Sequence, residues 1–451
     1  MKRRKAVSLA LVLIMVLTAI LIAGCGGGGE TTTPPAATEA PTGGTASATD
    51  APPASTDNVE TIKIGVIYAL TGASAATGVD QQSAIQLGFD IVNGSYADVG
   101  MPYAETEGIP SMGGAKIELI FANSEGDPEK GASEAERLIQ QEGVSMLMGC
   151  YQSSVVASAS QVAERAGIPF FVVESSSPSL TSRGFKYLFR QGPHDAMIGE
   201  SIFDFLDSIK DEHGIRRIAM VYDNSTYGTD AAASWTDNCE RRGYEVVESL
   251  PYPSNTVNMT SEIQRIKAAN PDLVLAASYV SDATLIMTTL KELDYMPGLI
   301  ANNTGFTEST FFTMMGADTE YIVSRLVYCS DYSEINPRAA AIEKLFNERT
   351  GIDNMNDNTA RAVQSAFVVA DVLDRAGSTD PEAIREAFIQ TDIPNEKLLV
   401  PWTKIAFNEQ GQNENALALL CQVQGGKYVT VWPESFATQE LIWPIPGWSE
   451  R

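Results

Sequence analysis

The sequence contains very little histidine, few cysteines and fewer basic than acidic residues. It has two histidines, five cysteines, and 31 Lys and Arg against 57 Asp and Glu, for a formal net charge of −26. So acidic a chain is poorly suited to nucleic acid, because phosphate binding requires many cationic contacts. We therefore expect no nucleic-acid partner. His194 and His213 alone leave little material for histidine-based catalysis.

The cysteines are widely spaced, and no two of them form a Cys-x-x-Cys pair. This pattern predicts neither a zinc site nor a dense disulfide scaffold, although export would permit one or two bridges. Sequence signatures of common enzymes are missing as well, including Gly-x-Ser-x-Gly, His-Glu-x-x-His and the Gly-x-x-x-x-Gly-Lys phosphate loop. We expect a protein that is not an enzyme and that uses no metal or cofactor.

The N-terminus begins with basic residues and continues into an apolar run. Residues 2–5 are all Lys or Arg, and the order of charge followed by apolar residues is typical of an export signal. The run is almost long enough to cross a bilayer, so a retained transmembrane helix is the alternative. It ends in Ile22-Ala23-Gly24-Cys25, which resembles the lipobox of bacterial lipoproteins. That resemblance implies removal of residues 1–24 and diacylation of Cys25.

Residues 25–58 contain no large apolar residue after Cys25 and consist mainly of Gly, Thr, Pro, Ala and Ser. Such a segment buries too little surface to offset the entropy of ordering it, which predicts a flexible linker. A cysteine that carries two acyl chains is sufficient for stable anchoring. We therefore expect an extracytoplasmic protein that is lipid-anchored to the cell membrane, at the outer face of the cytoplasmic membrane or in the periplasm.

The remainder of the chain alternates short apolar segments with helical patterns. Predicted strands lie at 61–70, 116–122, 144–150 and 168–174, and the alternation restarts at 216–224, 244–250 and 272–279. Apolar strands that are separated by helices are typical of an α/β fold with parallel sheets covered on both faces. The length of this part, about 390 residues, exceeds what one core usually serves, so we predict two lobes.

Small hydroxyl residues follow three predicted strands of the first run. They are Thr71, Ser74 and Thr77, then Ser153 and Ser154, then Ser175, Ser176 and Ser177. In a doubly wound sheet, ligands sit outside the carboxyl ends of the strands, where helix N-terminal amides are also unpaired. Hydroxyls and amides together form a cradle for a carboxylate or another small acceptor group. Simple helix capping by these serines is the alternative, and the sequence leaves both open.

Four stretches of the chain resemble the type I periplasmic-binding-protein family, in its branched-chain amino-acid-binding branch. They are "IKIGVIYALTGASAATG" (62–78), "GCYQSSVVASASQVAERAGIPFFV" (149–172), "SPSLTSRGFKYLFRQGP" (177–193) and "RRIAMVYDNSTYGTDAA" (216–232). The resemblance implies an α/β fold of two Rossmann-like lobes, joined by three hinge strands, with a ligand held between them. By this analogy lobe 1 takes 59–190 and 330–422, and lobe 2 takes 191–329 and 423–451.

The function implied by the resemblance is that of a solute-binding lipoprotein of an ABC importer. Its ligand would be a small polar solute, either an amino acid or a related carboxylate or amide, and its partner an ABC permease. A receptor that senses a ligand and signals to a membrane partner is the alternative. The family's ligand contacts correspond to Ser153 or Ser154, Ser175, Ser176, Tyr227 and Tyr279.

Two positions depart from the family's pattern. Asn303 stands where the amino-acid binders have an acid for the substrate ammonium, and Thr77 or Gly78 stands where they have an aromatic lid. Glu174, at the end of a predicted buried strand, would be costly to bury unpaired. It faces either a ligand ammonium or an arginine such as Arg190, and the sequence leaves the choice open.

Overall fold

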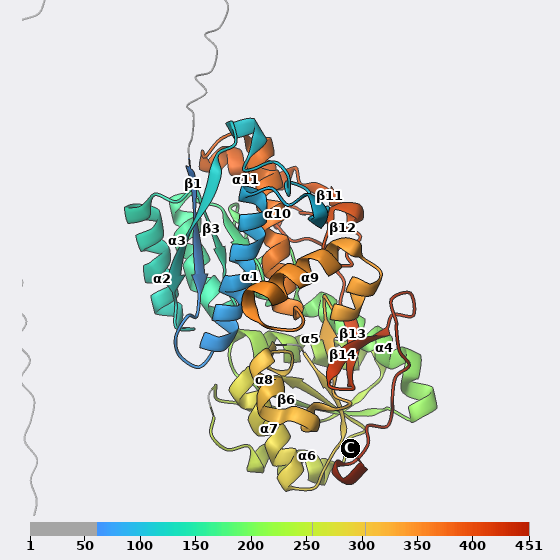
Figure 1. Ribbon diagram of the computed structural model, residues 1–451. Helices are drawn as coiled ribbons and strands as arrows, with labels where there is room; N and C mark the ends of the chain where they lie inside the picture. Colours follow the sequence, from blue (N-terminus) through green and yellow to red (C-terminus); the bar gives the residue numbers. More distant parts are fainter. Residues whose placement is uncertain (1–60, 255, 303, 451) are drawn as a thin grey trace, which may run out of the picture. The chain divides into compact units, whose positions relative to one another are not determined.

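The computed structural model describes residues 61–254, 256–302 and 304–450. The predicted signal peptide, the linker with Cys25, and Asn303 therefore lie outside the described residues. The rest of the chain divides between two α/β lobes, each built on its own sheet (Figure 1).

Lobe 1 contains a five-stranded parallel sheet with the order β2-β1-β3-β4-β5. Its strands are β1 (Thr61–Tyr68), β2 (Lys116–Asn123), β3 (Met146–Gly149), β4 (Phe170–Val172) and β5 (Leu188–Arg190). Their apolar side chains divide between two cores, one on each face of the sheet. One core includes α1 (Ala75–Asn93) and α10 (Asp357–Ala376), and the other includes α2 (Pro128–Arg137) and α3 (Ser153–Ala166).

Lobe 2 contains a seven-stranded sheet with the order β14-β13-β10-β9-β8-β6-β7. Its strands are β6 (Arg217–Asp223), β7 (Glu245–Tyr252), β8 (Leu273–Ala277), β9 (Gly298–Ala301), β10 (Val323–Leu326), β13 (Leu419–Gln424) and β14 (Lys427–Trp432). The first five strands are parallel and repeat the relative order of lobe 1, and the last two are antiparallel. The two lobes therefore share one strand topology.

Helices cover both faces of the second sheet. One core includes α4 (Asp195–His213) and α5 (Thr226–Arg242), and the other includes α6 (Thr260–Ala269), α7 (Val280–Glu292) and α8 (Ser309–Met315). In lobe 1, α9 (Pro337–Thr350) and α11 (Pro381–Ile389) complete the core around α10. A small two-stranded sheet, β11 (Asp392–Pro394) with β12 (Lys404–Ala406), precedes the last crossing of the chain.

The chain passes between the lobes three times, at 191–194, 327–336 and 407–418. The first and third crossings lie side by side, because Arg190 forms a parallel bridge with Gln412. Strand β13, which begins at Leu419, belongs to the sheet of lobe 2. The predicted boundary, after residue 422, placed residues 419–422 in lobe 1 instead.

In each lobe, a glycine near the start of a helix packs against the backbone at the end of the preceding strand. A Cβ on Gly78 of α1 would lie 2.0 Å from the carbonyl oxygen of Ala69, just past β1, and one on Gly228 of α5 would lie 1.9 Å from the carbonyl oxygen of Asp223, at the end of β6. Only glycine permits so close an approach of a helix to the end of a strand. The helix that follows the first strand of each sheet is thereby held tightly against the carboxyl edge of that sheet.

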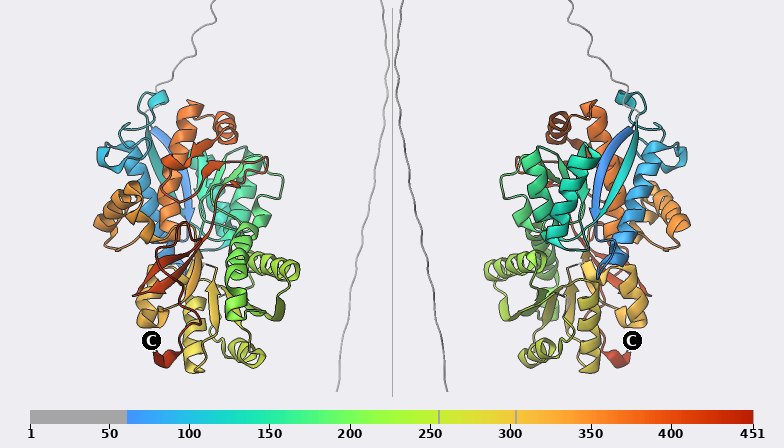
Figure 2. Two further views of the ribbon diagram at one scale, coloured as in Figure 1. Left: turned by 90° about the vertical axis from the view of Figure 1, so that its right-hand side faces the viewer. Right: turned by 90° about the vertical axis from the view of Figure 1, so that its left-hand side faces the viewer.

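The late helix α10 is buried along most of its length and packs against α1, with Ala366 next to Gly88. Figure 2 shows the orange α10 beside the blue α1 in both views. Among the described residues, no helix has the length and apolar character needed to cross a membrane.

Candidate functional site

A small cavity lies where the carboxyl ends of strands from both lobes meet. Its volume in this arrangement is about 10 Å³, which is room for about one water molecule. It is lined by Tyr151, Ser153, Glu174, Ser175, Ser176, Tyr227, Tyr279, Thr304, Arg325, Asn358 and Arg361. The lining residues come from the ends of β3, β4, β8 and β9, from β10, and from the first turns of α3, α5 and α10, so both lobes contribute. This is the position expected for a ligand site in a doubly wound sheet.

The wall from lobe 1 is rich in hydroxyls. Ser153 is the first residue of α3, and its Oγ accepts a hydrogen bond from the Ser177 N–H at 3.4 Å. Ser175 donates to the carbonyl oxygen of Cys150 at 2.8 Å, and Ser176 donates to Asp195 Oδ2 at 3.2 Å. The Ser153 hydroxyl and the α3 amides are thus best placed to donate to an anionic group.

The wall from lobe 2 is aromatic. The ring of Tyr279 lies 5.5 Å from that of Tyr151 and 5.6 Å from that of Tyr227, measured between centroids. The Tyr227 hydroxyl donates to the carbonyl oxygen of Asn302 at 2.6 Å. Burial raises the pKa of Tyr151 and of Tyr279 well above the ordinary value, so both phenols stay neutral. These rings present apolar surface to the cavity and fix its width.

Two buried arginines also line the cavity. Arg361, on α10, donates to Asp357 Oδ2 at 2.6 Å and to the carbonyl oxygen of Glu174 at 2.7 Å. Arg325, on β10, donates through Nε to Asn302 Oδ1 at 3.3 Å. Its Nη1 lies 3.8 Å from Asp357 Oδ2 and has no hydrogen-bond partner in the described part of the chain. Burial lowers the pKa of Arg325, and the charge of Asp357 opposes that effect.

Glu174 lines the same cavity, and its carboxyl is buried. Its Oε1 accepts a hydrogen bond from the Tyr68 hydroxyl at 2.7 Å, and its Oε2 has no partner among the described residues. Arg190 does not pair with it: the Arg190 guanidinium donates to Ser177 O and to Gln412 Oε1, each at 2.6 Å. Burial raises the pKa of Glu174 to about 8.

The lobes contact one another around the cavity. Asn358 of lobe 1 donates to Glu308 Oε1 of lobe 2 at 2.6 Å, and Ser309 of lobe 2 donates to Asp80 Oδ2 of lobe 1 at 2.8 Å. The Ser177 hydroxyl also donates to Asp230 on α5. These contacts join the two lobes around the cavity.

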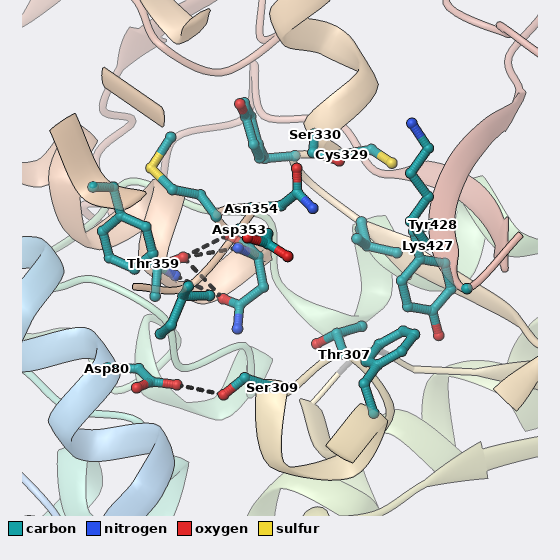
Figure 3. Close-up of a pocket in the computed structure, with 18 residues that line it drawn as sticks. Asp80, Thr307, Ser309, Cys329, Ser330, Asp353, Asn354, Thr359, Lys427 and Tyr428 are labelled. Carbon is teal, nitrogen blue, oxygen red and sulfur yellow. Dashed lines mark hydrogen bonds between the residues drawn. The ribbon is translucent and has the colours of Figure 1, made fainter. Parts of the chain in front are cut away.

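A larger pocket, of about 240 Å³, lies beside the second crossing (Figure 3). Its walls include Tyr328 and Cys329 of the crossing, Phe312 of α8, and Phe346 of α9. Asp80 and Ser309 point toward one another at its edge, as Figure 3 shows. This pocket is more apolar than the small cavity, and none of the predicted ligand-binding residues lines it.

Six of the predicted site residues line the small cavity: Ser153, Glu174, Ser175, Ser176, Tyr227 and Tyr279. Ser154 does not, because the next residue of a helix is rotated by about 100°. Thr77 is buried in α1, outside the cavity; burial raises the pKa of Glu308, and a hydrogen bond from Thr77 partly opposes that rise.

The other lining residues were not predicted; they are Tyr151, Thr304, Arg325, Asn358 and Arg361. Tyr151 stands between the end of β3 and the serines of α3, so its position at a strand end was a signal that could have identified it. No local sequence pattern pointed to Arg325 and Arg361, because their positions in the cavity depend on contacts between the lobes.

The four cysteines of the described part, Cys150, Cys239, Cys329 and Cys421, are buried free thiols. No cluster of three His, Cys, Asp or Glu side chains with metal-binding geometry occurs within the described ranges.

Comparisons with known proteins agree with this geometry. The family model described as "Periplasmic binding protein" matches residues 61–427. "Leu/Ile/Val-binding protein homolog 8" of Brucella abortus (strain 2308) is 27% identical over 394 residues, which cover 84% of this chain and 92% of that protein.

Two solved structures share the fold. The leucine-binding protein LivK of Thermotoga maritima MSB8 aligns with a TM-score of 0.70 and 20% identity, over 82% of this chain and 97% of that one. The branched-chain amino acid transporter substrate-binding protein LivJ of Streptococcus pneumoniae, in complex with isoleucine, aligns with a TM-score of 0.68 and 21% identity. That alignment covers 83% of this chain and all of the other.

Proposed function

The chain belongs to the periplasmic binding protein family, and on that premise we propose that it is the solute-binding lipoprotein of an ABC importer. Its ligand is a small polar solute, an amino acid or a related carboxylate or amide. The observation that carries this proposal is the single cavity to which Ser153 and Ser176 contribute from lobe 1 and Tyr227 from lobe 2. The likeness to leucine- and isoleucine-binding proteins makes these two amino acids the first ligands to test.

The ligand's negative group is bound by lobe 1. The Ser153 hydroxyl and the backbone amides of the first turn of α3 converge where the positive end of the helix dipole lies. The tyrosines of lobe 2 then cover the rest of the ligand. A solute held in this way contacts both lobes only in the closed arrangement.

Capture works by a shift of population between open and closed states. A ligand can drive closure only to the extent that it binds the closed state better than the open one. Contacts such as Asn358 to Glu308, which form between lobes, add to the stability of the closed state once the ligand fills the cavity. The closed form is the one that a permease recognises.

Cys25 is the proposed site of lipidation, and residues 25–58 are the proposed linker between the membrane and the lobes. Intact mass measurement of the membrane fraction tests this assignment. We expect a mature chain that begins at Cys25 and carries diacylglycerol. The Cys25→Ala variant should instead be found unprocessed, or released from the membrane.

The function is tested by identifying the bound solute. The protein is purified without denaturation, small molecules are released and identified by mass spectrometry, and each is titrated back by calorimetry. We expect one small polar solute that binds with a stoichiometry near one and is recovered chemically intact. Failure of every recovered solute and of the amino acids to bind would overturn the proposal.

A further inference from the structure

Among the described residues that line the cavity, Glu174 is the one acid, and one of its oxygens has no partner in the described part of the chain. We propose that Glu174 selects a positively charged group on the ligand, through its Oε2, and that its carboxyl releases a proton to solvent as that group binds. This inference rests on the proposed function. It adds the source of charge selectivity, which lies in lobe 1 and not at Asn303 of lobe 2.

The other acceptors near the cavity are already in use. Arg361 occupies the backbone carbonyl oxygen of Glu174 at 2.7 Å. Glu308 accepts hydrogen bonds from Asn356, Asn358 and Tyr151. The two carboxylate oxygens of Asp195 accept from Ser176 and Asn302. Glu174 lines the cavity, and its Oε2 is buried and accepts nothing within the described ranges, which leaves it as the acceptor for an ammonium.

A cationic hydrogen-bond donor, Arg325, lines the same cavity. Arg325 Nη1 is buried and makes no hydrogen bond in the described part of the chain. A buried polar group that lacks a partner is unfavourable, so both atoms gain when a ligand supplies the missing partner. A solute with one anionic and one cationic group satisfies Arg325 and Glu174 together, whereas an acid without an amine leaves Glu174 Oε2 unpaired.

The surroundings of Glu174 favour its neutral form in the closed, ligand-free state. Tyr68 on β1 donates to it, Cys150 follows β3 beside it, and Arg361 and Asp357 face it from α10. Arg361 directs its hydrogen bonds to the Glu174 carbonyl and to Asp357, not to the Glu174 carboxyl. The charge of Arg361 and the Tyr68 hydrogen bond lower the pKa, but burial outweighs them and the pKa of Glu174 is about 8.

Binding of an ammonium group changes this balance. The new positive charge next to Oε2 stabilises the carboxylate, so the carboxylic acid gives its proton to the buffer and an ion pair remains. No other bond is made or broken. Below about pH 8, therefore, ligand affinity should rise with pH by up to about tenfold per unit, which corresponds to one proton released per ligand.

The test measures protons directly. The wild-type protein is titrated by calorimetry at about pH 6.5 in buffers of different ionisation enthalpy, with L-leucine, L-isoleucine, the other protein amino acids and their 2-oxo acid counterparts as probes. We expect an amino acid to bind with release of nearly one proton, and its 2-oxo counterpart to bind at least tenfold more weakly. This measurement needs no variant and does not depend on how a mutant folds.

Glu174→Gln supplies the matching variant, because glutamine keeps the acceptor for Tyr68 and cannot titrate. We expect it to bind the amino acid at least tenfold more weakly, without proton release and with little pH dependence. Glu343→Gln is the control. Glu343 also accepts a hydrogen bond from a tyrosine, Tyr328, and burial raises its pKa to about 7, but it does not line the ligand cavity.

The outcomes separate this inference from the proposed function. Amino-acid binding without proton release, or full affinity in Glu174→Gln, overturns the role of Glu174 and leaves the solute-binding function intact. Tight binding of an acid that has no amine does the same. If no small solute binds at all, the proposed function fails, and this inference fails with it.

Discussion

The ring of Tyr151 in lobe 1 meets the ring of Tyr279 in lobe 2 edge to face, with their centroids 5.5 Å apart and their planes at 62°. Aromatic pairs in this geometry add about 0.5–1.5 kcal/mol beyond the area that they bury. The contact joins the two strand-end clusters that line the cavity. Under the proposed function, closure of the lobes and formation of the binding site are the same event, and the following predictions test the parts of that event.

Ser153 and Ser154 form a matched pair for testing the anion site. Ser153→Ala should weaken binding of a carboxylate ligand about tenfold, because a hydrogen bond to a charged group is worth about 1.5–3 kcal/mol. Ser154 is half-buried and does not line the cavity, so Ser154→Ala should leave the affinity unchanged. Calorimetry with the identified solute measures both. Equal losses in the two variants would show that the α3 hydroxyls act through helix stability.

Tyr227 tests the contribution of lobe 2. Tyr227→Ala should weaken ligand binding by about tenfold or more, because it removes the ring that packs beside Tyr279. Tyr227→Phe should lose less, since it removes only the hydrogen bond to the Asn302 carbonyl. Tyr187→Ala, which removes a tyrosine whose hydroxyl bonds to Glu382, is the control and should bind normally. Unchanged affinity of Tyr227→Ala would remove Tyr227 from the site.

Arg325 tests the recognition of a negative charge. Arg325→Gln should reduce the affinity for a carboxylate ligand about 10- to 100-fold, because the Nη1 donor and its charge are lost. Asp357 keeps its bond to Arg361 at 2.6 Å, so the variant does not leave that acid unpaired. Arg241→Gln, which alters an exposed salt bridge to Asp237, serves as the control. The prediction fails if both variants bind the ligand equally well.

Ser309 and Asp80 test lobe closure without touching the ligand. Ser309→Ala removes their 2.8 Å hydrogen bond and should destabilise the closed state by about 0.5–1.5 kcal/mol. We expect affinity to fall a few-fold and solution scattering to show more open molecules at partial saturation. Thr313→Ala on the same helix is the control, since its hydroxyl bonds to the Ser309 carbonyl within α8. Identical scattering of the wild type, Ser309→Ala and Thr313→Ala would show that the hydrogen bond between Ser309 and Asp80 does not stabilise the closed state.

The buried acids predict how stability changes with pH. Burial raises the pKa of Glu308 to about 8, as it does for Glu174. Between about pH 4.5 and 8 the folded chain therefore holds more protons than the unfolded chain, and the free energy of unfolding should fall as pH rises. The loss is at most about 1.4 kcal/mol per pH unit for each group.

Urea unfolding of the ligand-free protein across that range measures the slope. Glu308→Gln should flatten it, because glutamine does not titrate. A stability that rises steadily from about pH 5 to 8 would show that Glu308 is ionised in the folded protein.

Local sequence patterns were sufficient for much of the fold. The predicted strands at 216–224 and 272–279 contain β6 and β8. Asp127 precedes a proline and caps α2, with its side chain accepting from the Lys130 N–H at 2.9 Å. Periodicity and capping act within a few residues, so they can be read from the chain alone. The helix α4 was missed, although it lies directly after the predicted lobe boundary.

For the site, the sequence by itself determined which side chains stand at the strand ends, because a strand's end is a local property and parallel strands all finish at the same edge. It also determined the chemistry available there, namely hydroxyls, tyrosines and one acid. Only the tertiary structure decided that Glu174 meets Tyr68 and not Arg190, and that Arg325 and Arg361 enter the same cavity. Those pairings are set by how α10, β10 and the first sheet pack across the lobes, and contacts between residues so distant in the chain leave no periodic signal in it.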